Sequence, residues 1–351
     1  MLGFFSCLEM FPSKWSLWLF LLYITLFVNQ GWLVTKSQKS DNKYNYDTEI
    51  AVFLTEGIKL FVCIVGYSFQ HGFLSIVSET SRNTRVAALY FVPAGLYCIY
   101  NNLSYINLST FDPTTYFLAL QLRVVATGVV FQVIFNKKLS GKQWFSLVLL
   151  TAGCMLKVIN FGDAPVEIAQ QAQGKQLSLS ASFSSMLLLL QVACSCLAGV
   201  YNEYLLKSHS ENLSLYLQNI FQYLDSIICI VIILTFGGNI NKLFDHETYV
   251  PFNNIKVFLV IFNNAAIGIV TSFFLRYLNS ILKTFASGLE LVFTAILSRV
   301  LFSIPIYLNT VLSIFVVTVA TVIYSQNPVS TAKVRGKEDR EKLLEKSESI
   351  V

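Results

Sequence analysis

Charged side chains are scarce in this sequence. Only 13% of the 351 residues are Asp, Glu, Lys or Arg, about half the share in an ordinary soluble domain, which is roughly 25%. Apolar residues make up 54%, and phenylalanine alone occurs 29 times. This composition excludes a disordered chain, a basic nucleic-acid-binding domain and almost any soluble enzyme. It indicates a polytopic α-helical membrane protein.

Motifs of catalysis and metal binding are missing as well. There are three histidines, and the seven cysteines lie mostly inside apolar runs, where they are expected to be small buried hydrophobes. The phosphate-binding GxxxxGK[ST] loop, the HExxH motif and the DxD and HxxxxD motifs of glycosyl- and acyltransferases are absent. A membrane enzyme is the rival class, but it lacks an identifiable acid or base. No catalytic residue, metal or cofactor is predicted.

The apolar runs are long and continuous, for example over 226–236 and 311–324. A membrane β-barrel would instead alternate apolar and polar residues in segments of about ten. A membrane helix needs about 20 apolar residues. We therefore expect about ten helices, over 15–35, 48–69, 86–107, 112–135, 143–159, 183–207, 213–236, 255–279, 281–302 and 306–325.

An even number of helices places both termini on one side of the membrane. Lys and Arg are more numerous in the connections on that side and in the tail, which predicts cytosolic termini. The expected organisation is a cytosolic N-terminus over 1–14, a transporter domain over 15–325 and a flexible cytosolic tail over 326–351. The tail contains a dileucine pattern and a hydrophobic end, although an ordinary disordered tail explains both.

Two segments in different halves of the chain are weakly similar. Residues 119–123 and 133–135 match 286–290 and 300–302 at one common offset, which relates the fourth and fifth helices to the ninth and tenth. With five helices in each half, the second half inserts in the opposite orientation. The sequence thus predicts an inverted five-plus-five repeat, 15–160 and 182–325, an architecture typical of transporters.

Six ionisable residues are expected well inside the helices, at about 2.5–3.5 kcal/mol each on the insertion scale. We interpret them as lining a water-filled cavity between helices. Ion pairs are the alternative where a residue of opposite charge lies one helical turn away, as Lys207 does from Glu203 and Lys59 from Glu56. Arg123 and Glu290 occupy equivalent repeat positions and could pair across the pseudo-twofold axis. The six are Glu56, Lys59, Arg123, Glu203, Asp225 and Glu290.

Tyrosine and amide side chains accompany the basic residues in these helices. Aromatic rings stack on flat bases, amides form hydrogen bonds with base edges, and Lys or Arg neutralises phosphate. The combination suits a ligand that has a flat ring and anionic groups. The residues concerned include Tyr97, Tyr100, Asn101, Tyr116, Asn219 and Tyr223.

Ordered blocks along most of the chain carry a resemblance to a known family. They include Thr55-Glu56-Gly57-Ile58-Lys59, Asn101-Asn102-Leu103, Asp112-Pro113-Thr114-Thr115-Tyr116, Gln121-Leu122-Arg123 and Gly199-Val200-Tyr201-Asn202-Glu203. In these blocks the chain resembles the Golgi nucleotide-sugar transporters, in the branch of the CMP-sialic acid and UDP-galactose transporters, which belongs to the drug/metabolite transporter superfamily.

The resemblance implies a ten-helix antiporter of the Golgi membrane, possible also in the ER, that imports a nucleotide sugar and returns the nucleoside monophosphate. It allows a homo-oligomer or a complex with glycosyltransferases, and no nucleic-acid partner. Matched position by position, it implies phosphate-facing Lys59, Arg123 and Lys283. It also implies nucleotide contacts from Tyr97, Asn101, Tyr116, Gln121, Asn219 and Tyr223.

Asp225 departs from the pattern of the CMP-sialic acid transporters, which have serine there. A carboxylate beside an anion site disfavours an acidic sugar and suits the hydroxyls of a neutral hexose. We therefore expect a UDP-sugar, UDP-galactose or UDP-N-acetylglucosamine, exchanged for UMP. The alternatives are CMP-sialic acid as the substrate, or a transport-incompetent scaffold or chaperone of the same fold.

Overall fold

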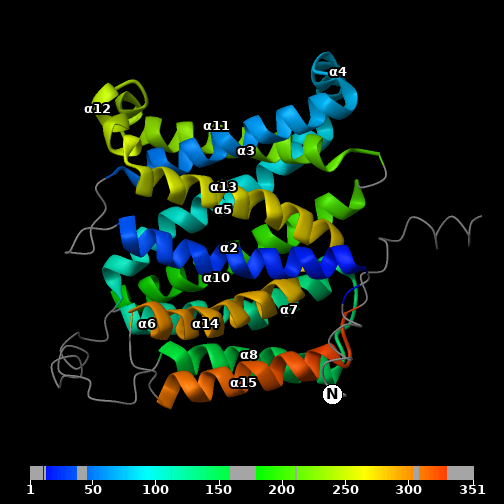
Figure 1. Cartoon of the computed structure of the whole chain (residues 1–351), viewed down its shortest axis with the longest axis vertical. Helices are drawn as coiled ribbons and strands as arrows, with labels where there is room; N and C mark the ends of the chain where they lie inside the picture. Colours follow the sequence, from blue (N-terminus) through cyan, green and yellow to red (C-terminus); the bar gives the residue numbers. More distant parts are fainter. Residues whose placement is uncertain are drawn as a thin grey trace, which may run out of the picture.

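The computed structural model describes residues 11, 13–37, 46–111, 113–158, 179–209, 212–302 and 308–329. These residues form a stack of helices that run back and forth across the molecule, and no strand occurs among them (Figure 1). The all-helical, polytopic class expected from the composition is confirmed. The proposed tail motifs and most of residues 1–14 lie outside the described residues.

Nine spans within the described chain are long and apolar enough to cross a membrane. The remaining expected helix, the fifth, corresponds to α8 (Gly141–Val158) and is less apolar because Lys142 and Lys157 lie near its ends. The start of the first described helix, α2 (Lys14–Ser37), and the end of the last, α15 (Leu308–Ser325), lie on one side of the stack (Figure 1). The long helices are α2 (Lys14–Ser37), α3 (Thr48–His71), α5 (Thr84–Thr110), α8 (Gly141–Val158), α10 (Leu179–Ser208), α11 (Leu215–Phe236), α13 (Ile255–Tyr277), α14 (Ser280–Phe302) and α15 (Leu308–Ser325).

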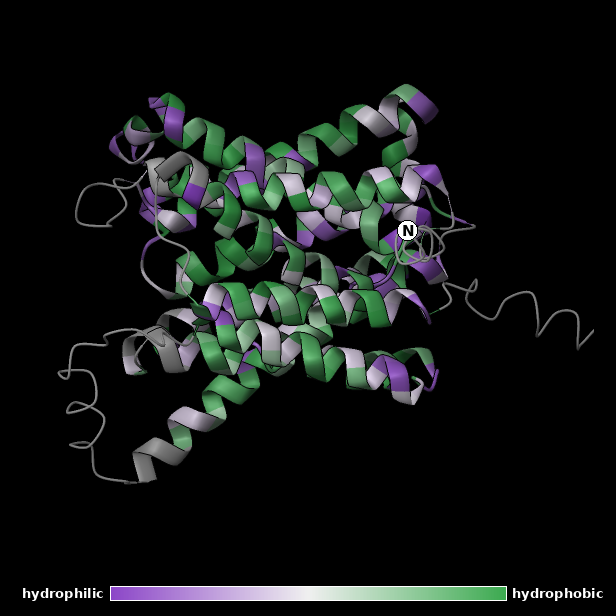
Figure 2. Cartoon of the chain, turned by 60° about the horizontal axis from the view of Figure 1, so that its bottom comes forward, coloured by the Kyte–Doolittle hydropathy of each residue, from purple (hydrophilic) through white to green (hydrophobic). Residues whose placement is uncertain are grey.

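The outer surface of the stack is that of a membrane protein. Large apolar side chains such as Trp18, Phe61 and Phe315 are each 67% exposed, which a water-soluble monomer would rarely tolerate in such number. Hydrophilic residues gather mostly toward the two ends of the helices, and apolar residues occupy the middle (Figure 2).

Local capping sets several helix starts. The Asp47 side chain accepts hydrogen bonds from the backbone amides of Glu49 and Ile50 at the start of α3. At the start of α8, the amide of Ser140 donates to Gln143 Oε1 at 2.8 Å, and the amide of Gln143 donates to Ser140 Oγ at 3.3 Å. This reciprocal pair is a capping box, and such caps are the reason that the helix ends lie close to those expected.

The prediction of one continuous helix over 112–135 is wrong in one respect, because the helix is interrupted. It consists of α6 (Pro113–Leu120) and α7 (Arg123–Phe135). At the break, the amides of Gln121, Leu122 and Val124 bond to carbonyls three residues earlier rather than four, which tightens the backbone locally. The side-chain amide of Gln121 donates to Phe117 O at 3.3 Å.

Two connections contain helices that the sequence did not predict. Between α3 and α5 lies α4 (Leu74–Arg82), and the connection after α11 contains η1 (Ile240–Leu243), α12 (His246–Tyr249) and η2 (Val250–Asn253). These elements lie on opposite sides of the stack (Figure 1). They are too short to span a membrane and therefore lie at its edges.

Neighbours in the stack come largely from different halves of the chain. The most extensive contacts join α8 to α15, α5 to α10, α2 to α13 and α3 to α11. Between α8 and α15 the backbones approach closely, since a Cβ on Gly153 would lie 2.9 Å from Val317 and Ser313 Oγ donates to Gly153 O at 2.7 Å. Small residues and interhelical hydrogen bonds of this kind are how helices associate in lipid.

Candidate functional site: a charged cavity between the two halves

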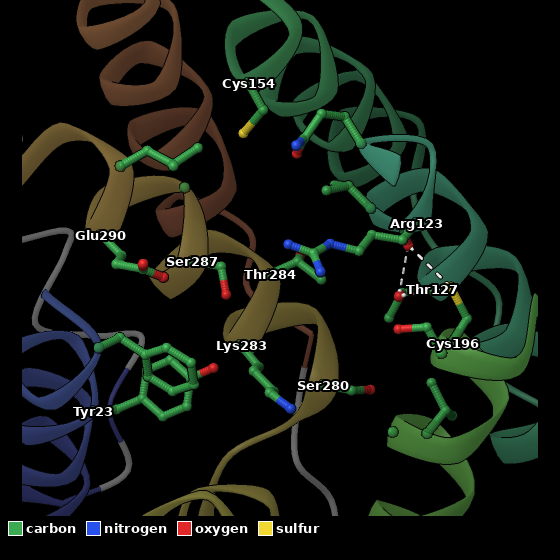
Figure 3. Close-up of a pocket in the computed structure, with 18 of the residues that line it drawn as sticks. Tyr23, Arg123, Thr127, Cys154, Cys196, Ser280, Lys283, Thr284, Ser287 and Glu290 are labelled. Carbon is green, nitrogen blue, oxygen red and sulfur yellow. Dashed lines mark hydrogen bonds between the residues drawn. The ribbon is translucent and has the colours of Figure 1, made fainter. Parts of the chain in front are cut away.

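A cavity of about 420 Å³ lies in the middle of the stack, between α2, α5, α7, α8, α10 and α14 (Figure 3). Its size falls within the roughly 300–1,000 Å³ typical of small-molecule sites. Helices of both halves of the chain supply its walls. The lining residues that matter most below are Tyr97, Gln121, Arg123, Lys283, Ser287 and Glu290.

The longest row of polar groups in the cavity comes from one face of α14. Ser280, Lys283, Thr284, Ser287 and Glu290 all line the cavity, at intervals of three and four residues, which place side chains on one side of a helix. Lys283 and Glu290 are seven residues apart, which is about 10 Å along a helix at 1.5 Å per residue. The wall formed by α14 therefore has a cation toward one end and a carboxylate toward the other.

Arg123 enters the cavity from the opposite wall (Figure 3). It is the first residue of α7, directly after the break in the helix. Its carbonyl oxygen accepts hydrogen bonds from Thr127 Oγ1 at 2.7 Å and from Cys196 Sγ at 3.3 Å, which fix the start of α7 against α10. The break thus places Gln121 and Arg123 together at the cavity wall.

The cations of the cavity have no carboxylate partner among the residues that the structure describes. Within the described parts of the chain, no carboxylate oxygen lies within 4.0 Å of the Arg123 or Lys283 nitrogens. Arg123 and Glu290 line the same cavity without forming the ion pair that their repeat positions allowed. Two unpaired basic groups in a membrane-embedded cavity are costly, and an anionic ligand would offset that cost.

A second set of charges next to the cavity is fully paired. Glu203 is completely buried, and its carboxylate accepts hydrogen bonds from Lys207 Nζ and from the backbone amide of Ser280, both at 2.6 Å. Lys207 also donates to the carbonyl oxygen of Leu278. The ion pair expected as an alternative for Glu203 is therefore present, and it ties α10 to the connection between α13 and α14.

Four of the ten predicted site residues line the cavity: Tyr97, Gln121, Arg123 and Lys283. Tyr116 does not. Its ring is buried, and its hydroxyl lies 2.9 Å from both Ser104 Oγ and Gln191 Nε2. These bonds join α6 to α5 and α10. Asn101 is exposed on α5, one turn beyond Tyr97.

Lys59, Asn219 and Tyr223 lie together at a different place, between α3 and α11. Lys59 Nζ is 2.5 Å from Glu56 Oε1 and 4.5 Å from the centre of the Tyr223 ring. The second expected ion pair is thus also present. Asn219 is completely buried, and neither polar atom of its side chain has a hydrogen-bond partner among the described residues, although buried amides are normally satisfied.

Asp225 also lies outside the cavity lining. It is partly buried on α11, and its Oδ2 atom has no hydrogen-bond partner. The carboxylate that lines the cavity is that of Glu290. Among the described residues, no group of three or more His, Cys, Asp and Glu side chains could hold a metal ion.

A family model for the nucleotide-sugar transporters matches residues 16–325, which is most of the chain. The protein belongs to this family of transporters and is a multi-pass membrane protein. It is 50% identical over 351 aligned residues to the UDP-galactose transporter senju of Drosophila melanogaster, an alignment that covers 93% of this chain and 90% of the relative.

A second relative is more distant. The CMP-sialic acid transporter 1 of Oryza sativa subsp. japonica is 32% identical over 315 residues, which cover 86% of this chain and 92% of that protein. A solved crystal structure superposes with a TM-score of 0.60 at 11% identity and covers 89% of this chain and 96% of that chain. The latter similarity supports the fold alone.

Proposed function

We propose that this protein carries a UDP-sugar, UDP-galactose or UDP-N-acetylglucosamine, from the cytosol into the Golgi or ER lumen in exchange for UMP. The observation that carries the proposal is the pair of unpaired cations, Arg123 and Lys283, on opposite walls of one cavity. Aromatic and amide groups at Tyr97 and Gln121 border them, as a base and a phosphate chain require. The similarity to a UDP-galactose transporter supports the choice of sugar.

In this proposal, Tyr97 and Gln121 contact the base, and Arg123 and Lys283 hold the phosphates. The cluster of Lys59, Asn219 and Tyr223 contacts the ligand in another conformation of the transport cycle. The buried side chain of Asn219 supports this second contact. Its polar atoms have no hydrogen-bond partner among the described residues, and a ligand could supply one.

The two halves, residues 15–160 and 182–325, act as inverted repeats. Exchanging each helix for its counterpart five helices later converts the α5–α10 contact into the α13–α2 contact. The same exchange converts α5–α11 into α13–α3, α10–α7 into α2–α14, and α7–α8 into α14–α15. All of these pairs pack against each other, which is the pattern expected from a pseudo-twofold axis. Movement of one half against the other would open the cavity to each side in turn.

Exchange follows from the charges of the cavity. When the cavity is empty, Arg123 and Lys283 face it without an anion, and conversion between the two open forms should be slow. Either nucleotide neutralises them and permits conversion. The network around Glu203 joins the C-terminal part of α10 to the connection between α13 and α14. The ends of these helices lie on the side of the termini (Figure 1), and we propose that the network closes that side. The same side carries the excess of basic residues and is cytosolic.

The experiment is uptake into proteoliposomes by the purified full-length protein, with a panel of radiolabelled nucleotide sugars. Vesicles loaded with UMP are expected to take up UDP-galactose or UDP-N-acetylglucosamine faster than empty vesicles. Equal rates would refute obligatory exchange, and preference for CMP-sialic acid would refute the choice of a UDP-sugar. A complete absence of uptake would favour a scaffold of the same fold.

A further inference from the structure

Glu290 lines the cavity, but the proposed function assigns it neither to the base nor to the phosphates of the nucleotide. It lies on the same face of α14 as Lys283 and Ser287 (Figure 3). No cation lies within 4.0 Å of its carboxylate among the described residues. Glu290 is only partly exposed, and a carboxylate inside a membrane protein that forms no ion pair marks a functional position.

The cavity is lined by three kinds of side chain: aromatic and amide groups, cations, and one carboxylate. Tyr97, Tyr100 and Gln121 come from α5 and from the break before α7, whereas Arg123 and Lys283 supply the positive charge. Glu290 lies about 10 Å further along α14 than Lys283 by helix geometry. A nucleotide sugar likewise has three parts in series, which are the base, the phosphates and the sugar.

Only one of these parts suits Glu290. Phosphates are repelled by a carboxylate and have two cations elsewhere in the cavity. The base has the aromatic rings and the side-chain amide of Gln121. Sugar hydroxyls remain, and a carboxylate can accept two hydrogen bonds from neighbouring hydroxyl groups. Ser287, one turn away on the same face, adds a hydroxyl that can donate or accept.

We propose that Glu290 is the residue that selects the sugar, by accepting hydrogen bonds from the hydroxyls of a neutral hexose and repelling sugars that carry a carboxylate. The inference rests on the proposed function and deepens it. It moves the selectivity that the sequence assigned to Asp225 onto a different helix, because Asp225 lies outside the cavity lining and Glu290 lies within it.

The test compares three labelled ligands in the full-length protein: UDP-galactose, UDP-glucuronate and UMP. In Glu290→Gln and Glu290→Ala, the KM for UDP-galactose should rise about tenfold relative to that for UMP, because hydrogen bonds to a charged group are lost. UMP has no sugar, so its uptake reports folding and phosphate binding. Uptake of UDP-glucuronate should rise relative to UDP-galactose in both variants, since the repulsion is removed.

Two further variants sharpen the result. Glu247→Gln changes an exposed carboxylate of α12, far from the cavity lining, and should keep the wild-type ratio of the three ligands. Glu290→Asp keeps the charge on a shorter side chain and should retain the exclusion of UDP-glucuronate.

The outcomes separate the two proposals. An unchanged ratio of UDP-galactose to UMP in both Glu290→Gln and Glu290→Ala would overturn the role of Glu290 and leave the proposed function intact. A changed ratio in Asp225→Asn alone would overturn it as well and return the selectivity to α11. Absence of nucleotide-sugar uptake by the wild-type protein would overturn the proposed function and this inference with it.

Discussion

The charges in the membrane-embedded part of the chain fall into two groups that differ in their partners. Glu203 and Lys207 form a largely buried ion pair with additional backbone hydrogen bonds, whereas Arg123 and Lys283 face a cavity and have no carboxylate of the described residues within 4.0 Å. The paired charges hold helices together. The unpaired ones cost stability, and a bound anion would offset this cost. Removal of a charge should therefore have opposite effects on stability in the two groups.

The largest effect is expected for Glu203→Ala. This change leaves Lys207, which is only 15% exposed, without its carboxylate and removes the acceptor for the Ser280 amide, which should lower stability by about 3–5 kcal/mol. Thermal unfolding in detergent measures it. The double variant Glu203→Leu with Lys207→Met leaves no unpaired charge and should recover much of the loss. If the double variant were as unstable as the single one, the pair would not be what stabilises this region.

Lys283→Gln should show the opposite behaviour. Loss of a charged hydrogen bond to phosphate costs about 1.5–3 kcal/mol, so nucleotide affinity should fall roughly 10- to 100-fold. Stability without ligand should stay the same or rise, because a desolvated and unpaired cation is removed. Uptake and thermal unfolding of the same preparation measure both quantities. Unaltered uptake would contradict the phosphate assignment.

Substitutions in the pair of Glu56 and Lys59 should have effects on stability between those expected for the two groups. Its side chains are 13% and 10% exposed, so we expect a coupling energy of about 1 kcal/mol, above most surface pairs and below a fully buried one. Lys59→Met should cost more stability than Glu56→Gln, because it also removes the contact with the Tyr223 ring. A double-mutant cycle of thermal unfolding measures the coupling, and a value of zero would contradict the structural role of the pair.

The smallest effect belongs to a pair outside the spans. Lys242 Nζ lies 2.8 Å from Asp47 Oδ2, and the two side chains are 36% and 24% exposed. Partial burial alone would raise the pKa of Asp47, but hydrogen bonds from Lys242 and from the amides of Ile50 and Glu49 outweigh it and lower the pKa. The stabilisation is thus present above the ordinary Asp pKa of about 4 and is lost as the pH falls through the lower folded-state value.

Asp47→Asn should therefore cost at most about 1 kcal/mol near neutral pH, and less at high salt. The difference from the wild type should stay constant between about pH 5 and 8 and shrink below pH 4. Unfolding measured over this range at two salt concentrations tests the prediction. A difference that grew on acidification would contradict the sign of the pKa shift.

The sequence predicted the helices well because their determinants are local. Apolar runs and caps such as Asp47 and Ser140 lie within a few residues of the boundaries that they set. The break between α6 and α7 was missed because it contains neither Pro nor Gly, and nothing local marks a change from four-residue to three-residue hydrogen bonds. It depends on how α7 packs against α10.

The site was predictable in part, for a related reason. Of the basic residues that the resemblance implies, Arg123 and Lys283 line the cavity, whereas Lys59 lies beside Tyr223 between α3 and α11. Resemblance does not say which conformation would bring a residue to the ligand. Glu290 was recognised as a charge within a span and omitted from the site. Its spacing of seven residues from Lys283 could have predicted that both side chains lie on one face of the same helix, and both line the cavity.

The side chain of Gln121 has one further consequence. Its amide nitrogen donates to the carbonyl oxygen of Phe117, where the backbone amide of Gln121 would bond in an uninterrupted helix. A base that takes up this side-chain amide leaves the Phe117 carbonyl without a partner, and the backbone amide of Gln121 is then its nearest replacement. In the proposed function, ligand occupancy would therefore be linked to the continuity of the helix: the empty form would favour the break, and the loaded form a straight helix.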